Sequence, residues 1–366
     1  MPRIPVYQPD LTGKEREYVL ECLESTWISS KGRFIGEFES EFSKFVGAPH
    51  AISVSNGTVA LHLALLALDI GPGDEVIVPT FTYIASVNAI RYVGATPVFC
   101  DSRPDTWQMD PADVEQRITP RTRAVIAVHL YGGACEMPAL MDICRRHHLK
   151  MIEDCAEAIG TRINGCHVGT SGDVATFSFF GNKTITTGEG GMVVCKDAAL
   201  DDKMRRLRGQ GLAQDREYWH DIVGYNYRMT NICAAIGLAQ LERVDDILRR
   251  KAALASNYRS ALGSLPLTFQ THLPGEVSSH WMVTVLVPAR EVREPVRAAL
   301  AGAGIETRPT FYPIHTMSMY CAGQPDFPVA QDIAARGLNL PSWHGLGNAD
   351  IRDIANMLAI CLEGTA

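Results

Sequence analysis

The chain has 366 residues, 46% of them hydrophobic and 20% charged, and its formal net charge is -7. This composition is that of an ordered globular protein, and the length favours one large domain with a smaller one. The negative charge argues against a non-specific binder of nucleic acid or membrane surfaces, while a local basic pocket for an anionic substrate stays compatible with it. The N-terminal residues contain no apolar signal core, and the apolar stretch 61–68 is too short to span a bilayer. We therefore expect a cytoplasmic protein without a membrane segment.

Residues 11–22 are predicted to form a helix opened by Thr12 and Gly13, and residues 27–33 a polar loop. From residue 51 onward, short apolar runs mostly alternate with longer stretches that favour helices. The runs cover residues 51–54, 75–79, 96–100, 123–128, 150–154, 174–180 and 191–195. Strands that alternate with helices predict crossover connections, so we expect an α/β fold around a mainly parallel sheet covered by helices.

A helical pattern then extends from Asn231 to Arg259, and Glu242 and Arg243 open a charged face on it. The composition becomes turn-rich over residues 263–277, followed by a predicted strand at 280–287, a helix at 291–302 and a second strand at 304–309. This change predicts a domain boundary near residue 250. Residues 1–250 would form the large α/β domain with the N-terminal segment, and residues 251–366 a small α+β domain.

A short polar segment, Ser55 to Thr58, follows the first of these strands and precedes a strongly apolar helix. Its backbone N–H groups and the Thr58 hydroxyl would form an anion site at the positive end of the helix dipole. The same residues are also typical of a plain helix N-cap, and the segment alone does not decide between the two.

Two side chains lie at or just beyond strand ends in the middle of the chain. Asp154 ends the run 150–154, where open α/β sheets place ligand contacts, although a helix cap is an equally good interpretation. Lys183 stands in a polar turn between the runs 174–180 and 191–195, where most lysines are solvated surface residues. Together the two have a specific chemistry, because a pyridoxal phosphate enzyme needs one lysine for the Schiff base and one Asp beside the pyridinium nitrogen.

Spacing disfavours three other kinds of site. The ten cysteines are scattered, with no CxxC pair and no HExxH motif, so we predict no metal site and interpret Cys155, beside Asp154, as a packing residue. The GNKT sequence at Lys183 lacks the spacing of a P-loop, since Asn182 separates Gly181 from the lysine and residue 176 is Thr. No GxGxxG follows the first strand, which disfavours a dinucleotide enzyme.

The run from Asp154 through Ser178 and Lys183 to the GEGG turn resembles the sugar-nucleotide aminotransferases of fold type I. Residues 25–39, 55–68, 78–90, 224–242 and 306–317 resemble the GDP-perosamine synthase branch of that family. The resemblance implies a large domain with a seven-stranded sheet, pyridoxal 5'-phosphate as cofactor, and a cytoplasmic role in O-antigen and lipopolysaccharide biosynthesis. It further implies a ping-pong reaction in which L-glutamate leaves as 2-oxoglutarate and GDP-4-keto-6-deoxymannose becomes GDP-perosamine.

The resemblance also assigns roles at the cofactor. Lys183 and Asp154 are the catalytic pair, and the remaining cofactor-binding residues are Gly57, Thr58 and Ser178 at the phosphate, Tyr83 on the pyridine face, Glu157 and Asn226. Tyr83 could otherwise be a packing residue at a helix start. At the position of Glu157 many relatives carry Gln or His, whereas the perosamine branch has Glu.

Four residues are candidates for the nucleotide-sugar or the donor carboxylate: Trp27, Lys31, Arg228 and His315. Each could equally be a surface charge or a satisfied polar group. The family further implies a homodimer with shared sites, in which Asn226 donates to the cofactor phosphate of the other subunit, although Asn226 could also be a turn residue.

Three rival functions remain open. A related aminotransferase could act on a UDP- or dTDP-linked keto-sugar, because spacing says nothing about the nucleotide. A sensor protein on the same fold would bind without turnover. A sugar dehydratase of this fold carries His in place of the Schiff-base lysine, so the presence of Lys183 favours transamination.

Overall fold

The computed structural model describes residues 2–213 and 215–363. Its α-helices are α1 (Glu15–Glu24), α2 (Arg33–Val46), α3 (Gly57–Ala67), α4 (Ile84–Tyr92), α5 (Pro111–Gln116), α6 (Met137–His147), α7 (Ala198–Arg208), α8 (Asn231–Leu241), α9 (Val244–Leu262), α10 (Arg290–Gly302), α11 (Pro328–Arg336) and α12 (Asn348–Glu363). Short 3-10 turns lie at η1 (Leu130–Gly132) and η2 (Ile314–Thr316). The strands are β1 (His50–Val54), β2 (Glu75–Pro79), β3 (Thr96–Cys100), β4 (Thr122–Val128), β5 (Lys150–Asp154), β6 (Arg162–Ile163), β7 (Cys166–His167), β8 (Val174–Ser178), β9 (Gly191–Cys195), β10 (Thr268–Phe269), β11 (Glu276–Val277), β12 (Val283–Leu286), β13 (Arg308–Pro309) and β14 (Gly337–Leu340).

The large sheet has seven strands in the order β1-β9-β8-β5-β4-β2-β3. Neighbours from β8 through β5, β4 and β2 to β3 are parallel, whereas β9 runs antiparallel to both β8 and β1. Each of the seven apolar runs supplies one of these strands, and the predicted α/β fold with a seven-stranded, mainly parallel sheet is confirmed.

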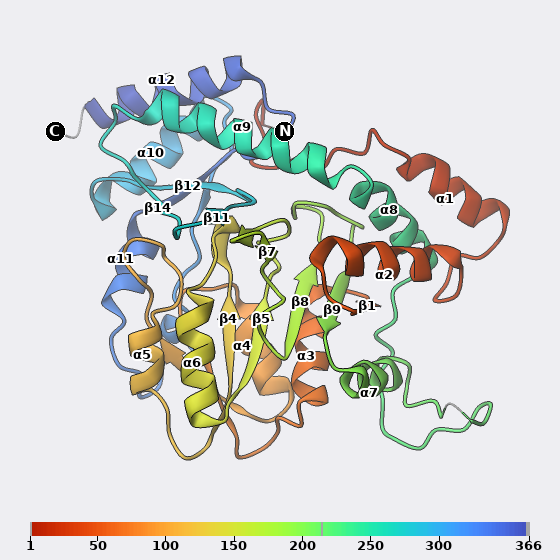
Figure 1. The fold of residues 1–366 in the computed structure, drawn as a ribbon. Helices are drawn as coiled ribbons and strands as arrows, with labels where there is room; N and C mark the ends of the chain where they lie inside the picture. Colours follow the sequence, from red (N-terminus) through yellow and green to blue (C-terminus); the bar gives the residue numbers. More distant parts are fainter. Residues whose placement is uncertain (1, 214, 364–366) are drawn as a thin grey trace.

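Helices cover both faces of this sheet (Figure 1). On β2, Val76 and Val78 join a core that includes residues of α3 and α4, while Ile77 joins a core with residues of α5 and α6. This alternation follows from the two-residue period of a strand, which sends successive side chains to opposite faces. The third core joins α2 and α8 to β8 and β9.

The C-terminal part contains a four-stranded antiparallel sheet, β10-β12-β14-β13, whose core includes residues of α9, α10 and α12. Ile4 belongs to this core and forms a β-bridge with Ile305, so the extreme N-terminal segment packs with the C-terminal part. Residue 250 lies inside the continuous helix α9. A third, three-stranded sheet, β11-β6-β7, joins residues 276–277 to residues 162–163 and 166–167.

The first helix and the helical region 231–259 differ from the sequence prediction. The first begins at Glu15, because Asp10 accepts hydrogen bonds from the backbone and hydroxyl of Thr12 and holds that turn outside the helix. The predicted helix 231–259 is two helices separated at residues 242–243, and Arg243 there forms an ion pair with Asp10 at 3.0 Å. The predicted strand at 304–309 is limited to β13. No helix in the described ranges has the length and apolar character needed to cross a bilayer.

Candidate active site

The candidate site lies where β5 and β8 end. Asp154 is the last residue of β5, Ser178 is the last residue of β8, and Lys183 stands in the turn that leads from β8 toward β9. Since the two strands are parallel neighbours, their carboxyl ends meet at one edge of the sheet, which is the usual place for ligands in open α/β folds. Figure 1 shows the strands β4, β5 and β8 pointing toward this edge.

Lys183 is largely enclosed, with 13% of its side chain exposed. Its Nζ lies 3.6 Å from Glu157 Oε1 and 4.1 Å from the centroid of the Trp281 ring. The turn that carries it is fixed at two carbonyls, because Tyr7 Oη donates to the Lys183 carbonyl and Trp281 Nε1 donates to the Asn182 carbonyl at 2.7 Å. The amine is therefore not a solvated surface group.

Glu157 is buried beside Lys183 and accepts a hydrogen bond from the Tyr131 amide at 3.0 Å. Burial raises the pKa of Glu157 to about 7, while the nearby Lys183 ammonium and the Tyr131 amide act in the opposite direction. A carboxyl group that changes charge near neutral pH beside a lysine is a property often found at functional sites.

Asp154 is buried and accepts two hydrogen bonds, from Ser86 Oγ at 2.7 Å and from the Ala156 amide at 3.1 Å. The residues that follow it form turns and not a helix, so the helix-cap interpretation of Asp154 is wrong. Its carboxylate is held at the strand end by groups that leave further lone pairs for a ligand.

The start of α3 lies against the end of β8. Asn56 is the N-cap of α3, and its side chain accepts a hydrogen bond from the Val59 amide at 3.0 Å. The amides of Gly57 and Thr58, in the first turn, have no partner within the helix. A Cβ added at Gly57 would lie 2.8 Å from Ser178 Cβ. The missing side chain thus allows the start of α3 to approach Ser178 closely.

A profile of the DegT/DnrJ/EryC1/StrS aminotransferase family matches residues 9–359. The chain belongs to this aminotransferase family. It is 57% identical to a GDP-perosamine synthase of Escherichia coli O157:H7, with 96% of each chain covered. It is 52% identical to a GDP-perosamine synthase of Vibrio cholerae, with 97% of this chain and 98% of that one covered. Among solved structures, the PLP-form of a putative sugar aminotransferase, Spr1654 from Streptococcus pneumoniae, superposes with a TM-score of 0.94 at 29% identity over 99% of each chain.

The cofactor of this aminotransferase is pyridoxal phosphate, and the residues present fit it. The open N-terminus of α3 beside Ser178 suits a phosphate, because helix N-termini bind anions through unpaired amides. The buried Asp154 carboxylate suits a protonated ring nitrogen, and the enclosed Lys183 amine suits the aldehyde carbon.

Tyr83 and His315 lie in different surroundings. Tyr83 is 58% exposed at the start of α4, and its ring centroid is 5.8 Å from that of Phe311. His315 is buried, with Nδ1 at 2.7 Å from Thr80 Oγ1 and Nε2 at 3.2 Å from Gln331 Nε2. Burial lowers the pKa of His315, so this histidine is a neutral, hydrogen-bonded group in the aminotransferase.

Asn226 and Arg228 lie in an extended segment beside the end of β1. Arg228 forms a β-bridge with Val54 there. Arg228 Nη2 donates to Asn226 Oδ1 at 3.4 Å, while Arg228 Nε is buried and has no hydrogen-bond partner among residues 2–213 and 215–363. Trp27 and Lys31 are exposed in the loop before α2, which is fastened to the start of α8 by a 2.7 Å bond from Asn231 to the Trp27 carbonyl. In the described ranges, no hydrogen bond, ion pair or ring contact links Trp27 or Lys31 to Lys183.

His129, Glu153 and Cys155 form a buried group close enough together to hold a metal ion. Their hydrogen bonds are nevertheless those of a structural network. Glu153 accepts the Gly169, Ser171 and Gly172 amides. His129 Nδ1 accepts the Cys135 amide at 3.1 Å, so its Nε2 carries the proton that Glu153 accepts at 3.1 Å.

Sequence reasoning missed Trp281, Tyr7 and Ser86. Trp281 is in an apolar run that indicates only a strand, and Tyr7 lies in a segment with no recognisable pattern. Ser86 lies in the 78–90 segment, four residues after Thr82, but nothing in its spacing relates it to Asp154.

Proposed function

We propose that this protein transfers an amino group from L-glutamate to the keto group of GDP-4-keto-6-deoxymannose, giving GDP-perosamine and 2-oxoglutarate. The substrate is proposed from the sequence identity of 52–57% to two GDP-perosamine synthases. The alignments cover nearly the whole length of this chain and of each relative. The site is consistent with this reaction, because it offers an enclosed lysine and buried carboxylates at the strand ends.

Lys183 and Asp154 are the proposed catalytic pair. Bound pyridoxal phosphate supplies an electron sink for the carbanion that forms when the donor loses its α-proton. Asp154 would keep the ring nitrogen protonated, and Ser86 and Ala156 hold its buried carboxylate at the strand end. Lys183 Nζ takes the proton from the α-carbon of glutamate and returns a proton in the sugar half of the reaction.

The remaining cofactor contacts are proposed from the same geometry. Gly57, Thr58 and Ser178 bind the phosphate at the start of α3, and Tyr83 covers one face of the ring. Glu157 accepts or releases a proton next to Lys183, as its pKa near 7 allows.

Trp27, Lys31, Arg228 and His315 are the proposed contacts of the nucleotide-sugar or donor carboxylate. Arg228 has the strongest support, because a guanidinium with a buried, unpartnered Nε can gain an anionic ligand. His315 would have to exchange its bond to Thr80 or Gln331 for one to a substrate.

We further propose a cytoplasmic homodimer that acts in O-antigen and lipopolysaccharide biosynthesis. The dimer would share its sites, with Asn226 of one subunit donating to the cofactor phosphate of the other. Within each subunit, residues 1–250 would form the large domain and residues 251–366 the small one.

The test is a substrate panel. Purified protein with pyridoxal phosphate and glutamate is given GDP-4-keto-6-deoxymannose and the corresponding UDP- and dTDP-linked keto-sugars, and the products are identified by mass spectrometry. The GDP sugar should be converted to GDP-perosamine, and the Lys183→Ala protein should give none. A clear preference for a UDP or dTDP sugar would overturn the substrate, and cofactor binding without turnover of any sugar would favour the sensor function.

A further inference from the structure

Four residues, Lys183 among them, form a closed ring of contacts that includes the amine of Lys183. Lys183 Nζ lies 3.6 Å from Glu157 Oε1 and 4.1 Å from the centroid of the Trp281 ring. Trp281 stacks on Tyr131, with ring planes 11° apart and centroids 6.1 Å apart. The Tyr131 amide closes the ring of contacts by donating to Glu157 Oε2 at 3.0 Å. The amine thus has a carboxylate on one side and an aromatic face on another.

Trp281 is fixed from both ends. It is 4% exposed, and its indole N–H donates to the carbonyl of Asn182, the residue before Lys183, at 2.7 Å. Its own carbonyl accepts a hydrogen bond at 3.1 Å from Lys251 Nζ, on α9, which also donates to the Ser342 carbonyl. Since Lys251 is fully buried, these bonds are shielded from water. The indole therefore holds both the backbone and the side chain of the lysine turn.

The backbone is strained where the two aromatic rings meet. Tyr131 and His280 have φ values of 56° and 48°, which are unusual for bulky residues. Gly132 has φ of 92°, and a Cβ there would lie 2.6 Å from the His280 nitrogen and 2.7 Å from that of Trp281. Backbone strain of this kind persists only where the surrounding structure imposes it, and it is found mainly at functional sites.

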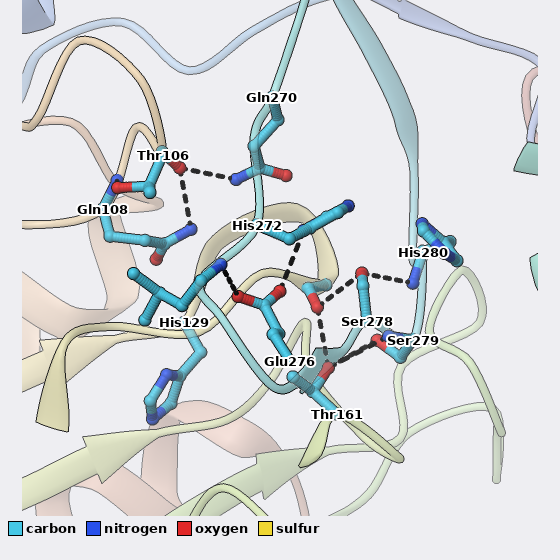
Figure 2. A network of polar contacts seen from close by, with 12 residues as sticks. Thr106, Gln108, His129, Thr161, Gln270, His272, Glu276, Ser278, Ser279 and His280 are labelled. Carbon is cyan, nitrogen blue, oxygen red and sulfur yellow. Dashed lines mark hydrogen bonds and ion pairs between the residues drawn. The ribbon is translucent and has the colours of Figure 1, made fainter. Parts of the chain in front are cut away.

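Figure 2 shows the polar network that imposes this conformation. Ser278 Oγ and Thr161 Oγ1 both donate to the Gly132 carbonyl, at 2.8 and 2.7 Å. The His280 amide donates to Ser278 Oγ at 3.0 Å, and upstream Gln270 donates to the Thr106 carbonyl at 2.9 Å. The segment 270–280 is thereby tied to the large domain immediately before Trp281.

We propose that Trp281 is a positioning residue, which holds the amine of Lys183 between the indole face and Glu157 whenever that amine is not covalently bound. A free lysine side chain has several rotatable bonds, so without a partner it would leave the position from which it delivers a proton. The indole face attracts an ammonium, and Glu157 supplies the opposite charge. The inferred role of Trp281 in catalysis rests on the proposed function. The contact between Trp281 and Lys183 does not, since it is present without any substrate.

The test measures the free amine of Lys183 directly. The full-length protein is prepared with pyridoxamine phosphate and without cofactor, so that Lys183 is free in both forms. Brief acetylation with acetic anhydride, followed by mass spectrometry of the Lys183 peptide, reports how readily the amine leaves its contacts and reacts. Trp281→Leu removes the aromatic face and the indole N–H, whereas Trp281→Phe keeps a face and removes only the N–H.

Two controls accompany these variants. Lys14 lies over the Tyr18 ring at 5.5 Å on the surface and serves as an internal reference in each sample. Trp343→Leu changes a partly buried tryptophan that packs on the C-terminal core and reports the effect of a general perturbation.

At neutral pH, acetylation of Lys183 should be roughly five- to thirty-fold faster in Trp281→Leu than in the wild type, and should change less in Trp281→Phe. Lys14 should react equally in all proteins. Equal Lys183 labelling in Trp281→Leu, Trp343→Leu and the wild type would overturn the inference. If Trp281→Leu does not fold, Trp281→Met, which also lacks the aromatic face, decides: faster Lys183 labelling with unchanged Lys14 supports the inference, and unchanged labelling overturns it. A failure of the proposed function would appear in the substrate panel and would leave this labelling unaffected.

Discussion

Replacing Glu157 by Gln should stabilise the protein at neutral and alkaline pH while lowering its activity. Burial raises the pKa of Glu157 from 4.5 to about 7 despite the Lys183 ammonium 3.6 Å away. At about 1.4 kcal/mol for each pH unit, ionised Glu157 costs the folded state about 3 kcal/mol relative to the unfolded chain. Because the group is buried, solvent screening reduces this cost little.

The sign follows from the protons bound in each state. Between pH 4.5 and pH 7 the unfolded chain has lost the Glu157 proton and the folded chain retains it, so this group lowers the free energy of unfolding as the pH rises. Glu157→Gln lacks this dependence. Relative to the wild type, its free energy of unfolding should therefore rise by about 3 kcal/mol from pH 4.5 to pH 8, and its turnover should fall because the proton group beside Lys183 is lost.

The assay is urea unfolding of the cofactor-free proteins across this pH range, in which Lys183 is not covalently attached. Lys183→Ala is a useful control, because without the ammonium the pKa of Glu157 should rise further and the pH dependence should extend above pH 7. Parallel stability profiles of the wild type and Glu157→Gln would refute the reasoning, since Glu157 would then be ionised or solvated throughout.

Four further predictions concern the cofactor. Lys183→Ala should abolish turnover and borohydride trapping of the cofactor while circular dichroism shows a folded protein; trapping that persists would remove Lys183 from its role. Asp154→Asn should slow turnover by orders of magnitude, because an amide cannot hold the ring proton, and a near-normal rate would reduce Asp154 to a structural partner of Ser86. Gly57→Ala places a Cβ 2.8 Å from Ser178 Cβ, so titration should show weaker binding of pyridoxal phosphate; unchanged affinity would contradict a phosphate site there. Mixing Lys183→Ala with Asn226→Ala subunits should restore up to about half the activity per heterodimer if sites are shared, whereas only the sum of the parents' activities would assign Asn226 to its own subunit or to no role.

The sheet was predictable because its signals are local. Each strand is an apolar run of five to seven residues bounded by turns, and β2 shows why this suffices: every residue of Glu75–Pro79 is buried. The break between α8 and α9 was not predictable from periodicity, since the apolar pattern continues across it. At the break, Arg243 forms an ion pair with Asp10, a contact between residues far apart in the chain that periodicity does not reveal.

The site was predictable only in part, for the same reason. Asp154, Ser178 and Lys183 follow strands, so strand order brings them to one edge. Trp281 reaches the lysine turn from 99 residues beyond Asn182, and Tyr7 reaches it from 176 residues before Lys183. No spacing rule connects such residues, because their meeting depends on how the C-terminal part and the N-terminal segment pack.

The edge position of β1 has a consequence for the synthesis of the chain. Within the large sheet β1 pairs with β9 alone, so residues 50–54 gain their sheet partner only after residues 191–195 have left the ribosome. The β-bridge of Ile4 forms later still, because its partner is Ile305. Pairings between distant segments form late, and apolar strands that await them are prone to aggregate. Chaperones, or the chain's own helices α2 and α3, therefore have to cover β1 until β9 has been synthesised.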